Sequence, residues 1–321
     1  MLCDSPPKPK RLTLSIANYR VIRILTRPNR LQATERRIVI ALVTDSASQL
    51  SPELAAEFGV RIAPIIVNID GVEYREGVDL TADDFWSRLG DGDIPEITTS
   101  QPSPGTLSEI YRSAVEGGAT DIVSVHIGAE HSGTINSALV AAEMVDVEVH
   151  VVDSGTASFG VSCCVWEAGS AIAVGASASE VVGRVEEIRP SIGTAFILSA
   201  LEFARRGGRF DPSLLPDSEP GECEGVAVLS GYGGHLEVVA VGHSVDELCD
   251  QIVECFLSPG RTIRAGVCLA DPATLMFTEG IEERLQTAPV EVDLVRYRLG
   301  PSIAAHTGPG TAGGFWYCTD I

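Results

Sequence analysis

The sequence predicts an α/β protein with two domains. Hydrophobic runs typical of buried strands alternate with amphipathic segments typical of helices, which is the pattern of a sheet covered by helices. The chain of 321 residues is long for one hydrophobic core, and its apolar fraction of 45% supports a substantial core. The alternation restarts near Ile188. We therefore expect an N-terminal α/β domain over residues 38–190 and a C-terminal α/β domain over residues 191–321.

The N-terminal half begins with RRIVIALVTDS (Arg36–Ser46), an almost continuous apolar run that predicts a buried parallel strand. A short helix follows, with Ser51 as N-cap, Pro52 at its first position and Gly59 as its stop. The later elements expected here are a strand and a connecting ribbon at 60–70 and 72–80, helices at 81–90, 104–116, 132–145 and from about 159, and strands at 120–128 and 147–155. This order implies a parallel sheet with helices on both faces.

The C-terminal half is expected to contain a hairpin that turns at Gly233 and Gly234. Its other expected elements are a strand at 188–198, a helix at 199–208, a polar loop at 209–225, helices at 244–257 and 273–286, and strands at 262–272 and 290–300. The tail from Pro301 to Tyr317 is rich in glycine, and we expect His306 to lie in a turn within it.

The net charge of −21 argues against partners that carry phosphate, so we expect neither nucleic-acid binding nor attachment to an anionic membrane surface. The charge is uneven, because residues 1–37 carry nine Lys or Arg against two acidic residues. We expect this basic head to be a disordered extension, with a functional or targeting tail as the alternative. It has neither the long apolar segment nor the cleavage site of a secretory signal.

The eight cysteines form no C-x-x-C pair, and no histidine flanks them at zinc spacing. Reduced cysteines in a cytoplasmic protein without a metal site are the simplest interpretation. The apolar run from Val161 to Ala176 is interrupted by Glu167 and two glycines, so we do not expect it to span a membrane. A nucleotide- or phosphate-binding module is a further alternative, and it is disfavoured because no Walker A or clean G-x-G-x-x-G motif follows a strand. We expect no cofactor.

The stretch ITTSQPSPG (Ile97–Gly105) collects hydroxyl side chains in what we expect to be a loop. Ser103 and Pro104 are explained as the start of a helix, whereas Thr99 and Ser100 are not. Because ligands bind at the carboxyl ends of strands in open α/β sheets, the hydroxyls that follow three other strands are also candidates for a site. Those residues are Thr44 and Ser46, Ser132 and Thr134, and Ser154 and Thr156.

Seven motifs occur in the order VTDSASQL, YREGVDL, TTSQPSPG, HSGTINSA, VVDSGTAS, RRGGR and GPSIAAHTGPG. Together they resemble the DegV family of bacterial fatty-acid-binding proteins, over roughly Arg37 to Tyr317. The resemblance implies a two-domain α/β fold that holds one long-chain, palmitate-like fatty acid in a cleft between the domains. It also implies a carrier without catalytic residues, which presents the acyl carboxylate to a separate fatty acid kinase.

The resemblance implies that Thr99, Ser132 and His306 bind the carboxylate. A carboxylate only accepts hydrogen bonds, and hydroxyls and an imidazole N–H are suitable donors. Ser132 is expected to open a helix, whose N-terminal N–H groups favour an anion. Gly133 would let a ligand approach the backbone closely. The further candidate site residues are Ser46, Ser100 and Thr134.

Several alternatives stay open at this stage. A serine hydrolase acting on acyl esters could use Ser132, His306 and either Asp45 or Asp153, although the G-x-S-x-G elbow is missing. The small-residue helix at 160–178 could line the acyl channel or pack in the core. The three arginines of RRGGR could face a partner or end a helix, and the other histidines are expected to be solvated or in the core. Family members usually carry a basic segment after the hairpin, whereas VAVGHSVDEL (Val239–Leu248) has no Lys or Arg.

Overall fold

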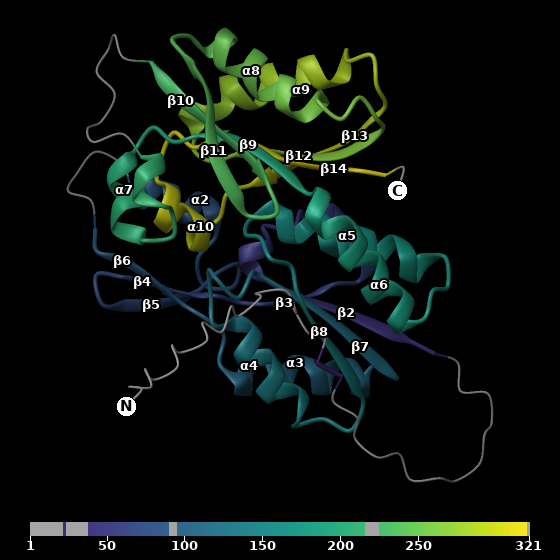
Figure 1. The fold of residues 1–321 in the computed structure, drawn as a ribbon. Coiled ribbons are helices and arrows are strands. Elements are labelled where there is room, and N and C mark those ends of the chain that lie inside the picture. The colour runs from purple at the N-terminus through teal and green to yellow at the C-terminus, as the bar shows by residue number, and fades with distance from the viewer. Residues whose placement is uncertain (1–21, 24–37, 90–94, 216–224, 320–321) are drawn as a thin grey trace, which may run out of the picture.

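The computed structural model describes residues 22–23, 38–89, 95–215 and 225–319. The basic extension expected at 1–37 lies outside this part of the chain, apart from the two residues of strand β1. The elements form layers: a five-stranded sheet and a six-stranded sheet lie on opposite sides of a central pair of helices, α5 and α6 (Figure 1). A three-stranded sheet lies beside these layers. The structure therefore has the α/β class that the sequence predicts.

The five-stranded sheet has the order β1-β8-β7-β2-β3. Strands β8, β7, β2 and β3 are parallel, and β1 pairs with β8 in the antiparallel direction at one edge. The apolar runs of β2 and β7 are buried on both faces, as expected for parallel strands between layers of helices. The strands are β1 (Ile22–Arg23), β2 (Ile40–Asp45), β3 (Arg61–Ala63), β7 (Asp121–His126) and β8 (Glu148–Asp153).

Helices cover both faces of this sheet, as predicted. Helices α3 (Pro104–Glu116) and α4 (Thr134–Ala142) pack on one face, and α5 (Phe159–Ala173) and α6 (Ala178–Ile188) pack on the other (Figure 1). Helix α1 (Pro52–Phe58) packs beside α5.

The cap residues explain where these helices begin. Ser51 Oγ accepts from the N–H of Leu54, and Ser103 Oγ accepts from the N–H of Thr106, so each satisfies an otherwise unpaired donor of the first turn. Gly59 ends α1 in the left-handed conformation. These caps confirm the predicted bounds of α1 and α3.

The expected strand at 60–70 is in fact two strands in different sheets. The chain passes Pro64 between β3 and β4 (Ile66–Ile69), and β4 lies at the centre of the three-stranded sheet β5-β4-β6. The outer strands are β5 (Val72–Arg75) and β6 (Ile97–Ser100), and helix α2 (Ala82–Arg88) lies between them in the chain. The first four residues of the hydroxyl-rich stretch expected as a loop therefore form strand β6. Its β-branched residues Ile97, Thr98 and Thr99 favour this conformation.

The six-stranded sheet has the order β11-β10-β9-β14-β12-β13, in which only the pair β12–β13 is parallel. The predicted hairpin turns at Gly233 and Gly234, both of which have positive φ as a type I′ turn requires. Helices α8 and α9 cover the face turned away from α5 (Figure 1). The elements are β9 (Gly193–Ile197), α7 (Leu201–Gly207), β10 (Val226–Tyr232), β11 (His235–Gly242), α8 (Val245–Leu257), β12 (Ile263–Leu269), α9 (Leu275–Gln286) and β13 (Val292–Arg298).

The glycine-rich tail is regular structure, which corrects the prediction of a turn. Helix α10 (Pro301–Thr307) carries His306 in its last turn, and β14 (Ala312–Cys318) lies inside the sheet between β9 and β12. A Cβ on Gly313 would lie 2.1 Å from the carbonyl oxygen of Ala195, and one on Gly314 would lie 2.0 Å from that of Gly266. The glycines therefore allow close strand packing here, and do not mark a loop.

Helix α5 belongs to a core shared by both large sheets. Its residues pack with Val123 and Val125 of β7 on one side and with Tyr297 and Tyr317 on the other. The interruption of its apolar run, Glu167, binds Arg184 of α6 at 2.9 Å and Arg264 of β12 at 3.3 Å.

Within the described residues, short 3₁₀ turns connect these elements at Ser46–Ser48, Arg189–Ser191, Pro212–Leu214 and Pro272–Thr274. No helix within the described residues is long and apolar enough to cross a membrane.

The substitution Phe159→Ala tests the central role of α5. The Phe159 ring is fully buried and stacks on Tyr297 with their centroids 4.6 Å apart. We expect its loss to lower the free energy of unfolding by about 3–5 kcal/mol in urea titrations, because a cavity is left between the sheets. Val174, at the end of the same helix, is 87% exposed, so the control Val174→Ala should change the free energy of unfolding by less than about 0.5 kcal/mol. Equal effects of the two substitutions would contradict this role.

Candidate ligand-binding site

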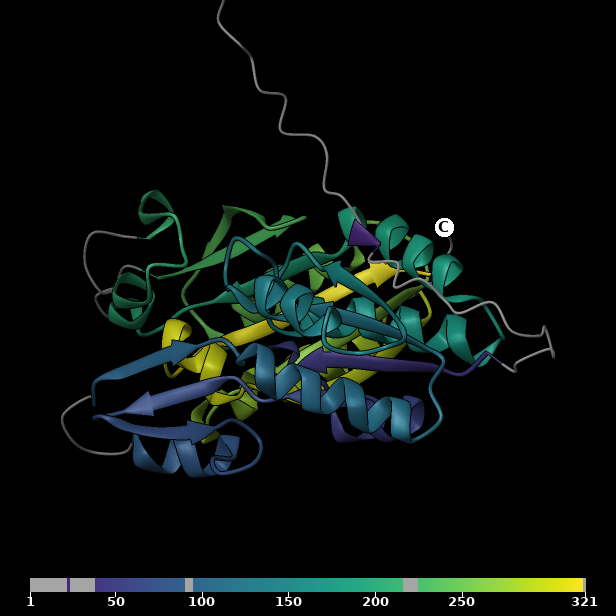
Figure 2. The same ribbon diagram turned by 90° about the horizontal axis from the view of Figure 1, so that it is seen from below.

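A cavity of about 390 Å³ lies where the three-stranded sheet, α10 and the inner face of the six-stranded sheet meet. Figure 2 shows α10 in yellow beside the strands of the three-stranded sheet in blue. The loops that follow β7 and β8 complete the wall. The cavity is therefore lined by residues from both halves of the chain, as a cleft between two domains would be.

Thr99 and His306 meet at this cavity although 207 positions separate them in the chain. Thr99 Oγ1 lies 3.0 Å from His306 Nε2, and both residues line the cavity. Alternation along β6 turns Thr99 to the side of its buried partner Val67, whereas Thr98 is exposed and does not line the cavity. Of the two adjacent threonines in ITTS, strand geometry thus selects Thr99.

The imidazole of His306 is neutral at physiological pH. Burial lowers its pKa to about 4, and the positive charge of Arg209 acts in the same direction. Nδ1 is buried beside the backbone of Gly207, which acts to raise the pKa of the ring, but it makes no hydrogen bond of normal geometry with a residue of the described chain. With its proton on Nε2, the ring donates to Thr99 Oγ1, and the Thr99 hydroxyl is then free to donate to an anion in the cavity.

Ser132 and Gly133 line the same cavity from the loop before α4. Ser132 Oγ lies 2.9 Å from Thr134 Oγ1 and accepts from the N–H of Thr134 at 3.3 Å. The helix begins at Thr134, two residues later than predicted, because Gly133 and not Ser132 occupies the N-cap position. A Cβ on Gly133 would lie 3.0 Å from Nε2 of Gln101, so this glycine makes room for a side chain that also lines the cavity.

Ser46 and Thr134 do not reach the cavity, which corrects their place among the candidate residues. Ser46 Oγ donates to Glu76 at 2.5 Å and accepts from the N–H of Ile65 at 2.9 Å. Thr134 is fully buried and bonds to Ser132. Ser100 does line the cavity, from the end of β6.

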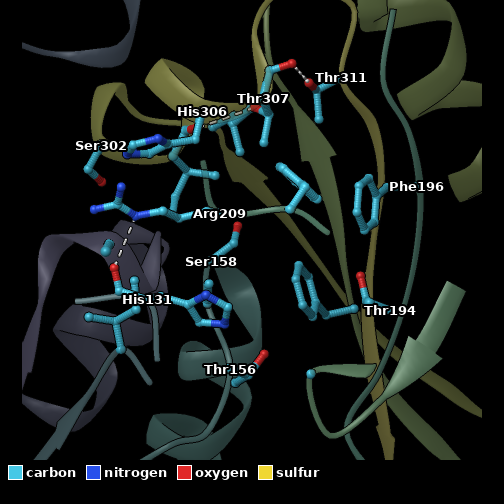
Figure 3. A pocket seen from close by; sticks show the side chains of 18 of the residues that line it. His131, Thr156, Ser158, Thr194, Phe196, Arg209, Ser302, His306, Thr307 and Thr311 are labelled. Carbon is cyan, nitrogen blue, oxygen red and sulfur yellow. Dashed lines mark hydrogen bonds between the residues drawn. The ribbon is translucent and has the colours of Figure 1, made fainter. Parts of the chain in front are cut away.

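Arg209 brings a positive charge to the cavity that the sequence analysis did not assign to it. This exposed guanidinium donates to the carbonyl oxygens of Gly207 at 2.9 Å and of His131 at 3.4 Å. No carboxylate among the described residues forms an ion pair with it. Figure 3 shows Arg209 beside His131 and His306, whose pKa values its charge helps to lower.

His131 was expected to be solvated or in the core, yet it lines the cavity too. Burial is the main reason that its pKa is lowered. Neither Arg209 nor His131 could be assigned to the site from the sequence. RRGGR allowed two interpretations, and the histidines other than His306 lack a ligand-like spacing.

Most other side chains of the cavity wall are apolar, and the polar ones are Thr156, Ser158, Thr194, Asp211, His235, Ser302, Thr307 and Thr311. Phe196 and Phe315 line it from the six-stranded sheet, and Ile65 and Leu214 contribute aliphatic surface. No residue of α5 is among the lining residues, so the small-residue helix packs in the core and does not line the cavity. The other apolar lining residues are Ala47, Ile127, Ala157, Ile192, Phe210, Leu236, Cys268, Tyr297, Leu299, Ile303 and Ala312.

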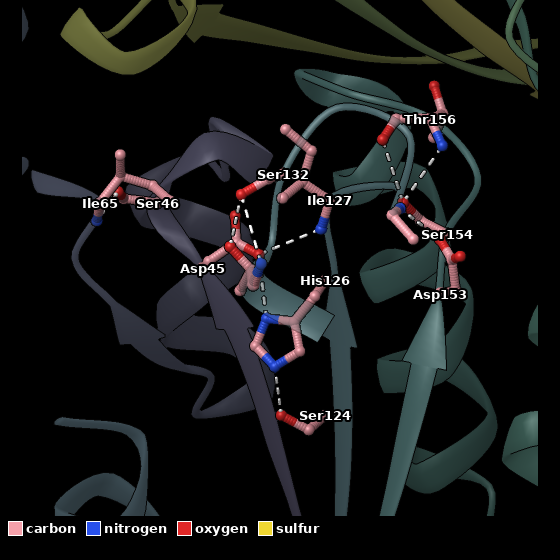
Figure 4. A network of polar contacts seen from close by, with 12 residues as sticks. Asp45, Ser46, Ile65, Ser124, His126, Ile127, Ser132, Asp153, Ser154 and Thr156 are labelled. Carbon is pink, nitrogen blue, oxygen red and sulfur yellow. Dashed lines mark hydrogen bonds and ion pairs between the residues drawn. The ribbon is translucent and has the colours of Figure 1, made fainter. Parts of the chain in front are cut away.

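The aspartates that could complete a hydrolytic triad have other partners. Asp45 Oδ2 accepts from Nδ1 of His126 at 2.9 Å and from the N–H of Ile127 at 3.0 Å (Figure 4). Asp153 Oδ1 accepts from the N–H groups of Gly155 and Ala129. Within the described chain, no carboxylate is hydrogen-bonded to His306.

The chain Asp45–His126–Ser124 has the order of contacts found in a catalytic triad. Ser124 Oγ lies 2.7 Å from His126 Nε2 and accepts from the hydroxyl of Tyr111. All four side chains are fully buried, and none lines the cavity. We interpret this chain as a buried polar network of the core, in which Asp45 Oδ1 has no hydrogen-bond partner among the described residues.

One cluster among the described residues has the composition of a metal site. Asp121, Glu148 and His150 place possible ligand atoms within 4.8 Å of one another. They lie at or near the amino ends of β7 and β8, away from the cavity, and His150 Nε2 lies 3.5 Å from Glu148 Oε1. We assign no function to this cluster.

The lowered pKa of His306 predicts a pH-dependent stability. Between pH 4 and 6.5 the unfolded chain binds a proton on this side chain that the folded protein excludes. The contribution of the neutral His306 side chain to the free energy of unfolding is therefore complete above pH 6.5. It is lost as the pH falls toward 4, by up to about 1.4 kcal/mol for each unit of pKa shift.

Urea titrations between pH 4.5 and 7.5 test this expectation. The substitution His306→Asn should flatten the slope of unfolding free energy against pH relative to the unsubstituted protein. His243→Asn, at an exposed position after the hairpin, should leave the slope unchanged. An unaltered slope in the His306 variant would contradict the assignment of a buried, neutral imidazole.

Comparisons with known proteins agree with this fold. A family model described as "Uncharacterised protein, DegV family" matches residues 39–214. A DegV domain-containing protein of Caldanaerobacter subterraneus is 28% identical over 281 residues, which cover 86% of this chain and 98% of the relative.

Two solved structures are also similar. A DegV family protein from Thermus thermophilus, described as binding fatty acid, is 31% identical, with a TM-score of 0.77 over 87% of this chain and 99% of its own. DegV of Bacillus subtilis, described as a fatty acid binding protein, has a TM-score of 0.75 at 24% identity over 88% of this chain and 100% of its own, which shows the common fold alone. Since the family model matches more than half of its length, this chain belongs to the DegV family.

Proposed function

We propose that this protein binds one long-chain fatty acid in the cavity, with the carboxylate at Thr99, Ser132 and His306. The observation that carries the proposal is the contact of Thr99 with a neutral His306 at the wall of a largely apolar cavity. The 31% identical relative from Thermus thermophilus, for which fatty acid binding is described, supports the class of ligand.

The carboxylate is bound by donors from three separate segments. Thr99 and Ser132 offer hydroxyl protons, and Ser100 and Gly133 offer further polar surface from the same loops. Arg209 lies at the cavity without a carboxylate partner in the described chain, so an incoming acid supplies the missing negative charge. The acid therefore meets a local positive charge on a protein with a net charge of −21.

The acyl chain lies against the apolar wall formed by Phe196, Phe315 and their neighbours. Each buried CH₂ group contributes about 0.8 kcal/mol, so a palmitoyl chain gains on the order of 10 kcal/mol before the cost of ordering it. This term dominates the affinity, and the polar contacts fix the orientation of the ligand.

In this proposal the protein is a carrier that presents the carboxylate to a fatty acid kinase, which forms the acyl-phosphate. The donors are neutral hydroxyls and one exposed arginine, so the head group stays free to react, because it is not locked in a buried ion pair. The segment from Val239 to Leu248 has no Lys or Arg, so it offers a kinase no basic surface. Of the exposed arginines of RRGGR, Arg209 lines the cavity and Arg206 pairs with Glu202.

Native mass spectrometry of the protein purified from bacteria tests the ligand directly. We expect one co-purifying fatty acid of about sixteen to eighteen carbons, with ~0.8 kcal/mol gained per buried CH₂ favouring long chains. A fatty acid kinase with ATP should then convert the loaded ligand to its acyl-phosphate. If the fatty acid co-purifies but the kinase forms no acyl-phosphate, presentation to the kinase is contradicted and fatty acid binding is not.

The substitution Thr99→Val tests the head-group contact with little change in side-chain volume. We expect the affinity for palmitate, measured by calorimetric titration, to fall by about 10- to 100-fold, because a hydrogen bond to a charged group contributes about 1.5–3 kcal/mol. Thr98→Val is the matched control, since it removes the adjacent hydroxyl from the exposed face of β6, and it should leave the affinity unchanged.

Two outcomes would overturn the proposal. Equal affinities of the Thr98 and Thr99 variants would show that Thr99 does not contact the head group. Turnover of acyl esters that disappears in Ser132→Ala would instead support the hydrolase interpretation.

A further inference from the structure

Glu76 is a buried carboxylate beside the cavity that neither the fold nor the proposed ligand contacts explain. Its side chain belongs to YREGVDL, and the residue is only 6% exposed. Burial raises its pKa, and hydrogen bonds from Ser302 and Ser46 oppose this effect. Within the described chain it forms no ion pair with an arginine or a histidine. Burying a carboxylate without a cation lowers the stability of a protein. The hydrogen bonds of Glu76 are therefore expected to have a function that an apolar side chain at this position could not perform.

The partners of Glu76 lie at the first turn of α10. Oε1 accepts from the N–H of Ser302 at 2.9 Å, and Oε2 accepts from Ser46 Oγ at 2.5 Å. Gln49 acts beside it: its Oε1 accepts from the N–H of Gly300, and its Nε2 donates to the carbonyl of Ser46 at 2.9 Å and approaches Glu76 Oε1 at 3.5 Å. Two side chains thus satisfy N–H groups that a helix leaves unpaired at its start, and the negative charge suits that end of the helix.

The other end of this helix carries the head-group histidine. Ser302 and His306 are four residues apart, so they lie on the same face of α10, one turn from each other, and both line the cavity. Fixing the backbone at Ser302 therefore fixes the direction in which His306 points toward Thr99. Trp86 supports the same segment, because its Nε1 donates to the carbonyl of Leu299 at 3.1 Å.

We propose that Glu76 is the positioning residue of the head-group site, and that it acts with Ser46 and Gln49 through α10 to hold His306 against Thr99. This inference rests on the proposed function, since the head group it serves is that of the fatty acid. It gives a role to Ser46, which the sequence suggested as a ligand contact and which instead donates to Glu76. It also explains the role of the two motifs at 43–50 and 74–80. Neither motif contributes a residue that contacts the head group, but both help to position the residue that does.

The substitution Glu76→Gln replaces the carboxyl group by an amide while it keeps the size of the side chain. Its amide oxygen can still accept from the N–H of Ser302, and its NH₂ group then faces Ser46 Oγ, whose proton can no longer be donated to residue 76 and must turn elsewhere. Glu180→Gln is the matched control. Glu180 accepts from the N–H of Ser177 in the capping box of α6, and it does not line the cavity.

Two readouts separate positioning from simple stabilisation. Nitrogen-15 spectra of labelled histidine side chains, with the His306 signal assigned from His306→Asn, report the tautomer and pKa of that ring in the ligand-free protein. Calorimetric titration with palmitate reports the affinity. For Glu76→Gln we expect a shifted His306 signal, a pKa that moves from about 4 toward the ordinary value, and at least a tenfold loss of affinity. Glu180→Gln should change neither.

The possible outcomes decide the inference. A Glu76 variant that unfolds at lower urea concentration while its His306 signal and affinity stay unchanged would overturn it, because Glu76 would then only stabilise the fold. If Glu76→Gln does not fold, Ser46→Ala decides with the same two readouts: a shifted His306 signal supports the inference and an unshifted one overturns it. If the unsubstituted protein binds no palmitate, the proposed function fails, whereas the His306 signal still tests the positioning role.

Discussion

The contact between Thr99 and His306 is the interaction on which the site depends. It joins an outer strand of the three-stranded sheet to the last turn of a seven-residue helix near the C-terminus, and so brings two distant segments to one cavity. Without it, the hydroxyl of β6 and the imidazole of α10 would be separate polar groups at the edge of an apolar space. Together they form a neutral pair that can direct a proton toward an acceptor.

The electrostatics of the site follow from the burial of His306 and the exposure of Arg209. His306 stays uncharged because burial and the charge of Arg209 both lower its pKa. Arg209 is exposed and keeps its charge while it donates only to backbone carbonyls in the described chain. An acid in the cavity would thus meet hydroxyl donors that are oriented by the neutral imidazole and backed by one cation. The anionic surface of the protein would be no obstacle at close range, since salt screens distant charges.

Much of the framework could be predicted from local chemistry. Ser51 and Ser103 cap helices at the predicted positions, and the apolar run of β2 forms a buried parallel strand as expected. Prediction failed where the residue composition of a segment suggests a different conformation from the one that the segment adopts. Thr98 and Thr99 looked like loop residues but lie in a strand, and Gly313 and Gly314 looked like a turn although they let three strands pack closely.

The site was predicted in part, for a related reason. Thr99, Ser132 and His306 line one cavity, although no local pattern brings them together and only the ordered motifs suggested it. Ser46 was misplaced because a hydroxyl after a strand does not reveal its partner, and a buried glutamate thirty residues later binds it. Arg209 and His131 reach the cavity through tertiary packing, which their sequence neighbours do not encode.

A crystal structure of the protein with palmitate is the most direct measurement of the central claim. The account predicts carboxylate oxygens within hydrogen-bonding distance of Thr99 Oγ1 and of Ser132 Oγ or His306 Nε2, with the chain along Phe196 and Phe315. A carboxylate that lies away from Thr99 and His306, or an acyl chain outside this cavity, would contradict it.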